Sequence, residues 1–255
     1  MSAPLARERR HTLYFLDSIR GFSPVHLDTE VDLTLVRRHR AVSESRCSTT
    51  AYLLYTAARV MAAHPAANAA SDGRRSAMHD AAHGKVTLDK TMNGRRVVLS
   101  TVLYDLDRTP LEDIQERLEH FRDGDPDTMP EFGPVRLLHR LPGPLGRLLF
   151  GLAVGPLARR WRTMGTFAVT SLGHRPVDGF HSVGGTTVTL GLGRTLDRPV
   201  VRDGQVVVAP VARLNLTFDH RVIDGAEAAD VLTEIKESLE TFGRPVAGAK
   251  GEDGR

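Results

Sequence analysis

The sequence is poor in cysteine, lysine and aromatic residues, and each shortage excludes a class of protein. Among 255 residues Cys47 is the only cysteine, so an intramolecular disulfide and a metal site built from cysteines alone are excluded. Because the first twenty residues also lack a signal-peptide pattern, we expect a cytoplasmic protein. Lysine occurs at only four positions, and aromatic residues make up 5% of the chain. The arginines are scattered as pairs, so we expect no nucleic-acid partner, which would need a clustered basic surface.

Long apolar runs are also missing. The most apolar window, residues 148–158, has eleven residues that include two glycines and a proline. A helix that spans a bilayer needs about 20 apolar residues, so this window is too short to cross a membrane. We interpret it as a buried or partner-facing helix in preference to a membrane-surface element, and we expect no membrane partner.

The remaining composition and patterning predict one α/β domain with a mixed sheet. Hydrophobic residues make up 41% and charged residues 25% of the chain, as in an ordinary globular protein. Strands and helices do not alternate regularly, so an α/β sandwich fits better than a doubly wound fold. We expect a domain over residues 1–242, an apolar helical insert of two short helices at about 125–162, and a disordered tail at 243–255. Helices are predicted at 7–20, 49–63, 111–121 and 231–242, strands at 25–35, 165–170, 186–191, 206–208 and 212–218, and a hairpin at 85–103 around Asn93-Gly94.

One segment near the C-terminus has the polar residues typical of a reactive site. A strand of alternating residues runs into Asp219, His220 and Arg221, and a tight turn at Asp224 and Gly225 precedes an alanine-rich helix. A histidine at a strand end lies at the rim of a sheet, where it can meet a ligand. From this pattern alone, a structural histidine beside a turn aspartate is an equally good interpretation. The other histidines show no paired metal-ligand spacing with carboxylates, so we predict no bound metal.

This segment resembles the signature of the dihydrolipoyl acyltransferase component of 2-oxoacid dehydrogenase complexes. The family pattern Asp-His-Arg-x-x-Asp-Gly is present without a substitution at 219–225. Four further family segments occur in the right order, at 30–32, 64–68, 165–173 and 198–204. That catalytic domain shares its fold with chloramphenicol acetyltransferase. The resemblance therefore implies a two-layer α/β sandwich with a mixed sheet and an active site at the interface of a homotrimer.

The resemblance also implies a role for each motif residue. His220 would act as general base, and the Thr170 hydroxyl would donate to the oxyanion of the tetrahedral intermediate. Asp224 would pair with an arginine of the N-terminal helix, which is Arg9 or Arg10, and we favour Arg9. Ser171, next to Thr170 on an extended strand, should face the other way. The residues expected at the substrate or cofactor site are Ser171, Asp219, Arg221, Gly225 and His26.

Three functions are compatible with these residues. We favour an O-acetyltransferase that moves an acetyl group from acetyl-CoA to a hydroxyl of a small molecule, similar to the enzymes of tetronate-type polyketide biosynthesis. The chain has no lipoyl-lysine motif, so we expect the acyl group on diffusible coenzyme A and no bound lipoyl group. The alternative is a truncated dihydrolipoyl acyltransferase core that exchanges acyl groups between coenzyme A and a lipoyl group on another chain. A silent scaffold is the third, and the intact His220, Asp224 and Thr170 argue against it.

Overall fold

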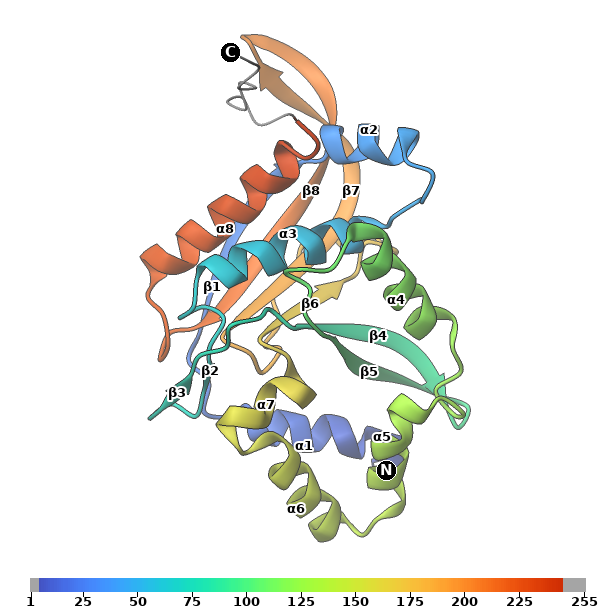
Figure 1. The fold of residues 1–255 in the computed structure, drawn as a ribbon. Helices are drawn as coiled ribbons and strands as arrows, with labels where there is room; N and C mark the ends of the chain where they lie inside the picture. The colour runs from blue at the N-terminus through green and yellow to red at the C-terminus, as the bar shows by residue number, and fades with distance from the viewer. Residues whose placement is uncertain (1–4, 245–255) are drawn as a thin grey trace, which may run out of the picture.

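One six-stranded mixed sheet forms the centre of the molecule (Figure 1). The structure is a computed structural model and describes residues 5–244. The strand order is β1-β8-β7-β6-β4-β5, with β6 parallel to both neighbours and the other pairs antiparallel. This architecture confirms the predicted α/β class with a mixed sheet. The strands are β1 (Pro24–Asp32), β4 (Gly84–Met92), β5 (Arg95–Leu103), β6 (Phe167–Ser171), β7 (Val188–Arg202) and β8 (Gln205–Asp219), and β2 (Ala70–Ser71) pairs with β3 (Ser76–Ala77) in a separate sheet.

Helices cover the apolar face of the sheet and enclose the main core (Figure 1). The helix α3 packs against both α4 and α8, and its Tyr52 and Leu54 are fully buried. Its start is capped by Ser48, whose hydroxyl oxygen accepts a hydrogen bond from the Ala51 backbone N–H. The bounds of α3 match the predicted 49–63. The helices outside the insert are η1 (Arg7–Arg9, a 3-10 helix), α1 (Arg10–Ser18), α2 (Thr34–Val42), α3 (Thr49–Ala63), α4 (Leu111–Asp123) and α8 (Gly225–Glu240).

The starts of two helices, α2 and α8, were not predicted from the sequence. The strand predicted at 25–35 ends at Asp32, whose carboxylate accepts hydrogen bonds from the backbone N–H and the hydroxyl of Thr34. This local turn starts α2, which the alternating apolar pattern concealed. The helix α8 begins six residues before the predicted 231, because the alanines of its first turns favour helix without adding apolar periodicity. Apart from 243 and 244, the predicted tail lies outside the described residues.

The opposite face of the sheet is polar, and the loop between β6 and β7 covers it. Thr189, Asn215 and Thr217 are 2–4% exposed and alternate with residues that face the main core. The loop approaches the sheet so closely that a Cβ on Gly193 would lie 1.9 Å from the Asp178 carbonyl oxygen. Only glycine fits at this position. The loop and the sheet therefore form a buried polar layer.

Both long hairpins turn at a pair of residues with positive φ, and the first turn is the one predicted at Asn93-Gly94. Asn93 and Gly94 have φ values of 49° and 72°, and Asp203 and Gly204 have 50° and 75°. Positive φ at both central residues is required by the type I′ turns that suit two-residue hairpins. The predicted hairpin at residues 85–103 is confirmed as β4 and β5.

The hairpin of β7 and β8 is longer than the three separate strands predicted for it. Each strand has fifteen residues, and the tip extends past the rest of the sheet (Figure 1). At the tip, Val201, Val206 and Val208 are 73–74% exposed. Such a row of exposed valines on a projecting hairpin is typical of a surface that contacts another chain.

The predicted apolar insert forms three α-helices instead of two, because breaks at Pro142 and Pro156 divide it into three helical segments. A stacked contact between the rings of Trp161 and His83, with centroids 4.5 Å apart, holds the last of these helices against the body, so Trp161 has a packing role. No helix within residues 5–244 is long and apolar enough to cross a membrane. The insert comprises η2 (Pro130–Phe132), α5 (Gly133–Arg140), α6 (Gly143–Val154) and α7 (Leu157–Met164).

Lys85 on β4 is a buried amine that the sequence analysis did not single out. Lys85 is only 3% exposed, and its Nζ donates a hydrogen bond to the Gly184 carbonyl. The ammonium also lies 4.6 Å from the centre of the Phe15 ring. Burial without a carboxylate partner lowers the pKa of Lys85 to about 7.

This lysine should make stability depend on pH between about 7 and 10.5. In that window the unfolded chain keeps the Lys85 proton and the folded chain releases it, so the free energy of unfolding rises with pH. Below pH 7 both states are protonated and the full burial cost remains. We expect Lys85→Met to abolish a rise of up to about 1.4 kcal/mol per pH unit, measured by urea unfolding at several pH values.

The control is Lys236→Met, because Lys236 lies at the surface beside Glu240. This variant should keep the wild-type slope. Equal slopes for wild type and Lys85→Met would contradict the assignment of the titration to Lys85.

Candidate active site

The structure brings His220 and Asp224 together at the end of β8. His220 directly follows the strand, and its backbone N–H donates to the Ser23 carbonyl at 2.9 Å, which fixes the turn against β1. Asp224 precedes the first residue of α8, and its Oδ1 lies 3.4 Å from His220 Nδ1. The two side chains are 47% and 88% exposed. A proton on Nδ1 facing Asp224 leaves Nε2 free to accept a proton from a ligand.

Asp219 and Arg221, predicted as substrate or cofactor residues, instead hold the turn in place. The Asp219 carboxylate is 2% exposed and accepts hydrogen bonds from the Ser23 backbone N–H and from Arg221 Nε and Nη2. Burial alone would raise the pKa of Asp219, but the hydrogen bonds from Arg221 and Ser23 outweigh it and keep that pKa below its ordinary value. The Asp219 carboxylate therefore has a structural role, and the expected place of Asp219 and Arg221 at the substrate or cofactor site stays a prediction.

Thr170 lies on β6 with its hydroxyl toward β4. The Thr87 hydroxyl donates to Thr170 Oγ1 at 2.9 Å, so the Thr170 proton is free to be donated elsewhere. Ser171 Oγ instead accepts from the Gly173 backbone N–H at 3.4 Å, consistent with the alternation of side chains along a strand. The sequence analysis missed Thr87, which only the parallel pairing of β4 with β6 brings next to Thr170.

His220 and Thr170 are far apart within one chain. The register pairs Thr170 with Gly191 and Gly191 with Asn215, and His220 lies five residues beyond Asn215. At about 3.3 Å per residue this separation exceeds about 15 Å along the strand. One acyl group cannot contact both side chains of the same chain, so a site that uses both needs a second copy.

The pairing of Arg9 with Asp224 is wrong for a single chain. Arg9 ends η1, which packs against β5 and α5, away from the turn that carries the histidine. The alternative residue, Arg10, is also occupied elsewhere. Its Nη1 donates to the carbonyls of His139 and Leu141 and so holds α5 against the N-terminal segment. Within residues 5–244 the recorded ion pair of Asp224 is with the histidine.

His26 and Gly225 lie near the turn without a recognisable ligand role in one chain. His26 Nδ1 is 3.0 Å from Thr217 Oγ1, and its ring lies 4.7 Å from that of His181. A Cβ on Gly225 would meet nothing within 4 Å. Their predicted place at the substrate site therefore stays a prediction. Cys47 is fully buried, and burial raises the pKa of its thiol, which argues against a reactive cysteine.

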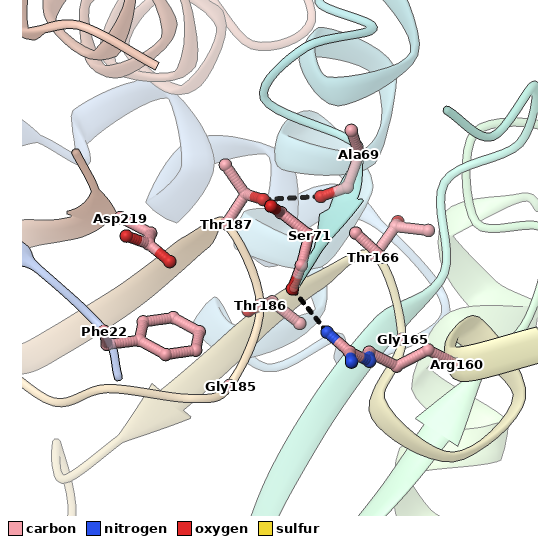
Figure 2. Close-up of a pocket in the computed structure, with 11 residues that line it drawn as sticks. Phe22, Ala69, Ser71, Arg160, Gly165, Thr166, Gly185, Thr186, Thr187 and Asp219 are labelled. Carbon is pink, nitrogen blue, oxygen red and sulfur yellow. Dashed lines mark hydrogen bonds between the residues drawn. The ribbon is translucent and has the colours of Figure 1, made fainter. Parts of the chain in front are cut away.

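The enclosed cavity beside Asp219 is too small for a substrate. Figure 2 shows it between Phe22, Arg160 and the glycine-containing loops of β6 and β7. Its volume is about 10 Å³, which is about enough for one water molecule. Arg160 closes one side by donating to the Ser71 carbonyl, and the Thr187 hydroxyl donates to the Ala69 carbonyl (Figure 2). We therefore exclude this cavity as an acyl-binding pocket.

A larger basic groove lies beside the part of β4 that follows Thr87. Its volume is about 500 Å³, and it begins two residues beyond Thr87, or about 7 Å along the strand. Arginine and lysine clusters of this kind bind phosphate groups. No group of three or more histidine, cysteine or acidic residues in the described chain could hold a metal ion. The groove is lined by Asp89, Lys90, Thr91, Arg96, Arg122, Pro126 and Arg175.

Residues 156–246, which include β6 and the histidine turn, match the family model "2-oxoacid dehydrogenases acyltransferase (catalytic domain)". This part of the chain is therefore similar to that catalytic domain. Over 50 residues it is 54% identical to the dihydrolipoyllysine-residue acetyltransferase component of the pyruvate dehydrogenase complex from Bacillus subtilis, and 50% identical to that from Staphylococcus aureus. These matches cover 20% of this chain and 11–12% of the relatives' length.

Solved structures show that the acyltransferase fold extends over nearly the whole chain. A probable dihydrolipoamide acetyltransferase from Listeria monocytogenes has a TM-score of 0.71 at 19% identity, covering 96% of this chain and 97% of that one. The Azotobacter vinelandii dihydrolipoamide acetyltransferase has a TM-score of 0.70 at 18% identity, covering 94% and 91%. A chloramphenicol acetyltransferase has a TM-score of 0.52 at 14% identity, covering 92% and 96%. The predicted fold, shared by dihydrolipoamide acetyltransferases and chloramphenicol acetyltransferase, is confirmed.

The Asp219–Arg221 pair should be important for stability. We expect Asp219→Asn to lower the free energy of unfolding by about 2–3 kcal/mol, because it leaves a partly buried guanidinium without its carboxylate. Urea unfolding at neutral pH measures this change. The control is Asp197→Asn, since Asp197 and its partner Arg37 are both more than 60% exposed, and this variant should be nearly neutral. Equal effects of the two substitutions would contradict the structural role of Asp219.

Proposed function

We propose that this chain is an acyltransferase that exchanges an acyl group between coenzyme A and a dihydrolipoyl thiol carried on another chain. The partly exposed pair of His220 and Asp224 is the observation that carries this proposal. The Azotobacter vinelandii enzyme was studied for the role of a serine, a histidine and an asparagine in its catalytic mechanism. Its histidine and asparagine are four positions apart, as are His220 and Asp224.

Proton transfer by His220 can be written without a covalent enzyme intermediate. Nε2 takes the proton of the attacking thiol, and the sulfur forms a bond to the thioester carbonyl carbon. The tetrahedral oxyanion then collapses and breaks the original carbon–sulfur bond. The departing thiolate takes the proton back from Nε2. Asp224 beside Nδ1 stabilises the imidazolium that exists between these two steps.

The oxyanion needs a donor, and we assign this role to Thr170 of a neighbouring copy. The free proton of Thr170 and its distance from His220 within one chain both support a shared site. The exposed valines at the tip of the β7–β8 hairpin supply an apolar surface for assembly. A homotrimer, as expected from the resemblance, would place such sites between copies.

Coenzyme A has phosphates that suit the basic groove along β4. Lys90, Arg96, Arg122 and Arg175 line the groove, and Asp89 is its one acidic residue. An acyl-pantetheine arm that extends from the groove along β4 would reach toward Thr87 and Thr170. The groove therefore supports coenzyme A as the diffusible partner.

Acetylation of a small-molecule hydroxyl, which we favoured from the sequence, stays a prediction. The lipoyl acceptor has better support, because the curated relatives are dihydrolipoyllysine-residue acetyltransferases. Similarity to tetronate-pathway enzymes has no support beyond the sequence motifs. The imidazole base itself serves a thiol or a hydroxyl acceptor equally well.

The acceptor can be identified by incubating the chain with acetyl-CoA and either dihydrolipoamide or a panel of hydroxylated compounds. Mass spectrometry should detect S-acetyl dihydrolipoamide and free coenzyme A. His220→Ala should lower the rate at least about a hundredfold by removing the base. Asp224→Asn should retain most of the activity, because the Azotobacter enzyme has an asparagine at this spacing.

The matched control is His64→Ala, since His64 is also a histidine beside a carboxylate, 3.0 Å from Glu234, but lies elsewhere. It should leave the rate unchanged. Acetylation of a hydroxyl without acetylation of dihydrolipoamide would contradict the dihydrolipoyl acceptor and support the small-molecule hydroxyl favoured from the sequence. Absence of both products would overturn the enzymatic proposal.

A shared active site can be tested by mixing two inactive variants. His220→Ala and Thr170→Val chains are unfolded and refolded together, and the thiol acetylation rate is compared with that of each variant refolded alone. Random trimers would contain about one intact site in four, so about a quarter of the wild-type rate should return. No recovery in a sample that light scattering shows to be oligomeric, or a mass equal to one 28.0 kDa chain, would contradict a site between copies.

A further inference from the structure

The helical insert has an unusual distribution of charge. Residues 133–164 contain six arginines and no aspartate or glutamate. The residues Arg140, Arg147, Arg159 and Arg162 are exposed. Arg147 also reaches Asp17 of α1 at 2.9 Å, but residues 133–164 themselves supply no negative charge. Its surface is therefore suited to an anionic partner.

Within this insert, α6 is apolar on two sides, and only one side is covered. On the inner side, Gly146 lies so close to Tyr14 of α1 that a Cβ would meet the Tyr14 hydroxyl at 2.8 Å. Phe150 packs against the same tyrosine, with ring centroids 6.1 Å apart, and Val154 is buried. The helix is thus attached to α1 by this side alone, at the lower edge of the molecule in Figure 1.

The outer side of α6 is a stripe of leucines. Leu145, Leu148, Leu149 and Leu152 occur at the i, i+3, i+4 and i+7 spacing of one helical face. They are 44%, 58%, 37% and 63% exposed. Helices that are apolar all round are normally buried, so this side lacks a partner in the single chain.

The insert presents this stripe on a fixed support. His11 Nδ1 lies 2.9 Å from His139 Nε2, which links α1 to α5. At the other end of the insert, Arg160 Nε donates to the Val154 carbonyl at 2.7 Å, and the ring of Trp161 stacks on His83. The four leucines are therefore held on one face of α6 without a partner.

We propose that α6 and the arginines around it dock on the surface of an anionic lipid bilayer. The four leucines would enter the boundary between headgroups and acyl chains, with the helix axis parallel to the membrane plane. The arginines of α5 and α7 would contact lipid phosphates on the anionic surface. This inference is independent of the acyl-transfer reaction and replaces the expectation of no membrane partner.

Other occupants of this face fit less well. In a symmetric contact between two copies, the acid-free segments 133–164 would bring arginines against arginines. Protein interfaces usually depend on aromatic anchors, whereas the exposed stripe here consists of leucine alone. Leucines on one side and arginines beside them are typical of helices that lie in a membrane interface.

Vesicle flotation tests the proposal with the full chain. We expect binding to vesicles that contain phosphatidylglycerol and phosphatidylcholine, little binding to phosphatidylcholine alone, and weaker binding at high salt. Replacing two leucines in Leu148→Ser/Leu152→Ser should weaken binding to the anionic vesicles at least about tenfold. Arg140→Gln/Arg159→Gln/Arg162→Gln should weaken it as well, through the lost charge.

The matched control is Val42→Ser/Met78→Ser, which removes two side chains that are 83% and 67% exposed on other elements. It should bind like the wild type. Equal binding by the control and the leucine variant, or no binding of the wild type to anionic vesicles, would overturn the proposal. Loss of oligomers in the leucine variant, seen by light scattering without vesicle binding, would assign the stripe to contact between copies.

Discussion

The buried carboxylate of Asp219 determines where His220 lies. It receives the Ser23 N–H from the segment before β1 and the guanidinium of Arg221 from the turn after β8. His220 lies between Asp219 and Arg221, so its backbone has little freedom. Its own N–H donates to the Ser23 carbonyl and completes the contact with that segment. In the proposed mechanism, a charge that does not meet the substrate thus orients a side chain that does. The family signature is then in part a folding signal and in part a chemical one.

The two-faced sheet separates structural and chemical tasks. The apolar face packs against α3 and α8, while the other face carries threonines and Asn215 beneath a close-fitting loop. Thr170 belongs to this polar face, and His220 lies beyond the end of β8. Because both positions are set by rigid strands, small movements cannot bring them together. In the proposed mechanism, assembly is then a condition for catalysis, and activity depends on protein concentration.

Local patterns predicted much of the fold and part of the site. The bounds of α3 and the hairpin at Asn93-Gly94 follow from residues adjacent in sequence, and so does the spacing of His220 and Asp224. The missed starts of α2 and α8 have local causes, whereas the errors about the site arise where distant segments meet. Arg9 was assigned to Asp224 by family position, but its place depends on how η1 packs against β5 and α5. The contact of Thr87 with Thr170, which joins residues 83 positions apart, has no signal in a single sequence.

The hydrogen bond from Thr87 has a consequence for the speed of the chemical step. A threonine hydroxyl is a rotor, and a β-branched side chain already restricts its first torsion. With one oxygen lone pair engaged by Thr87, the remaining proton of Thr170 is confined to directions away from β4. The dipole is then aligned before any charge develops on a bound carbonyl, so no reorganisation is needed as the reaction proceeds. Folding, rather than substrate binding, would supply the free energy for that alignment.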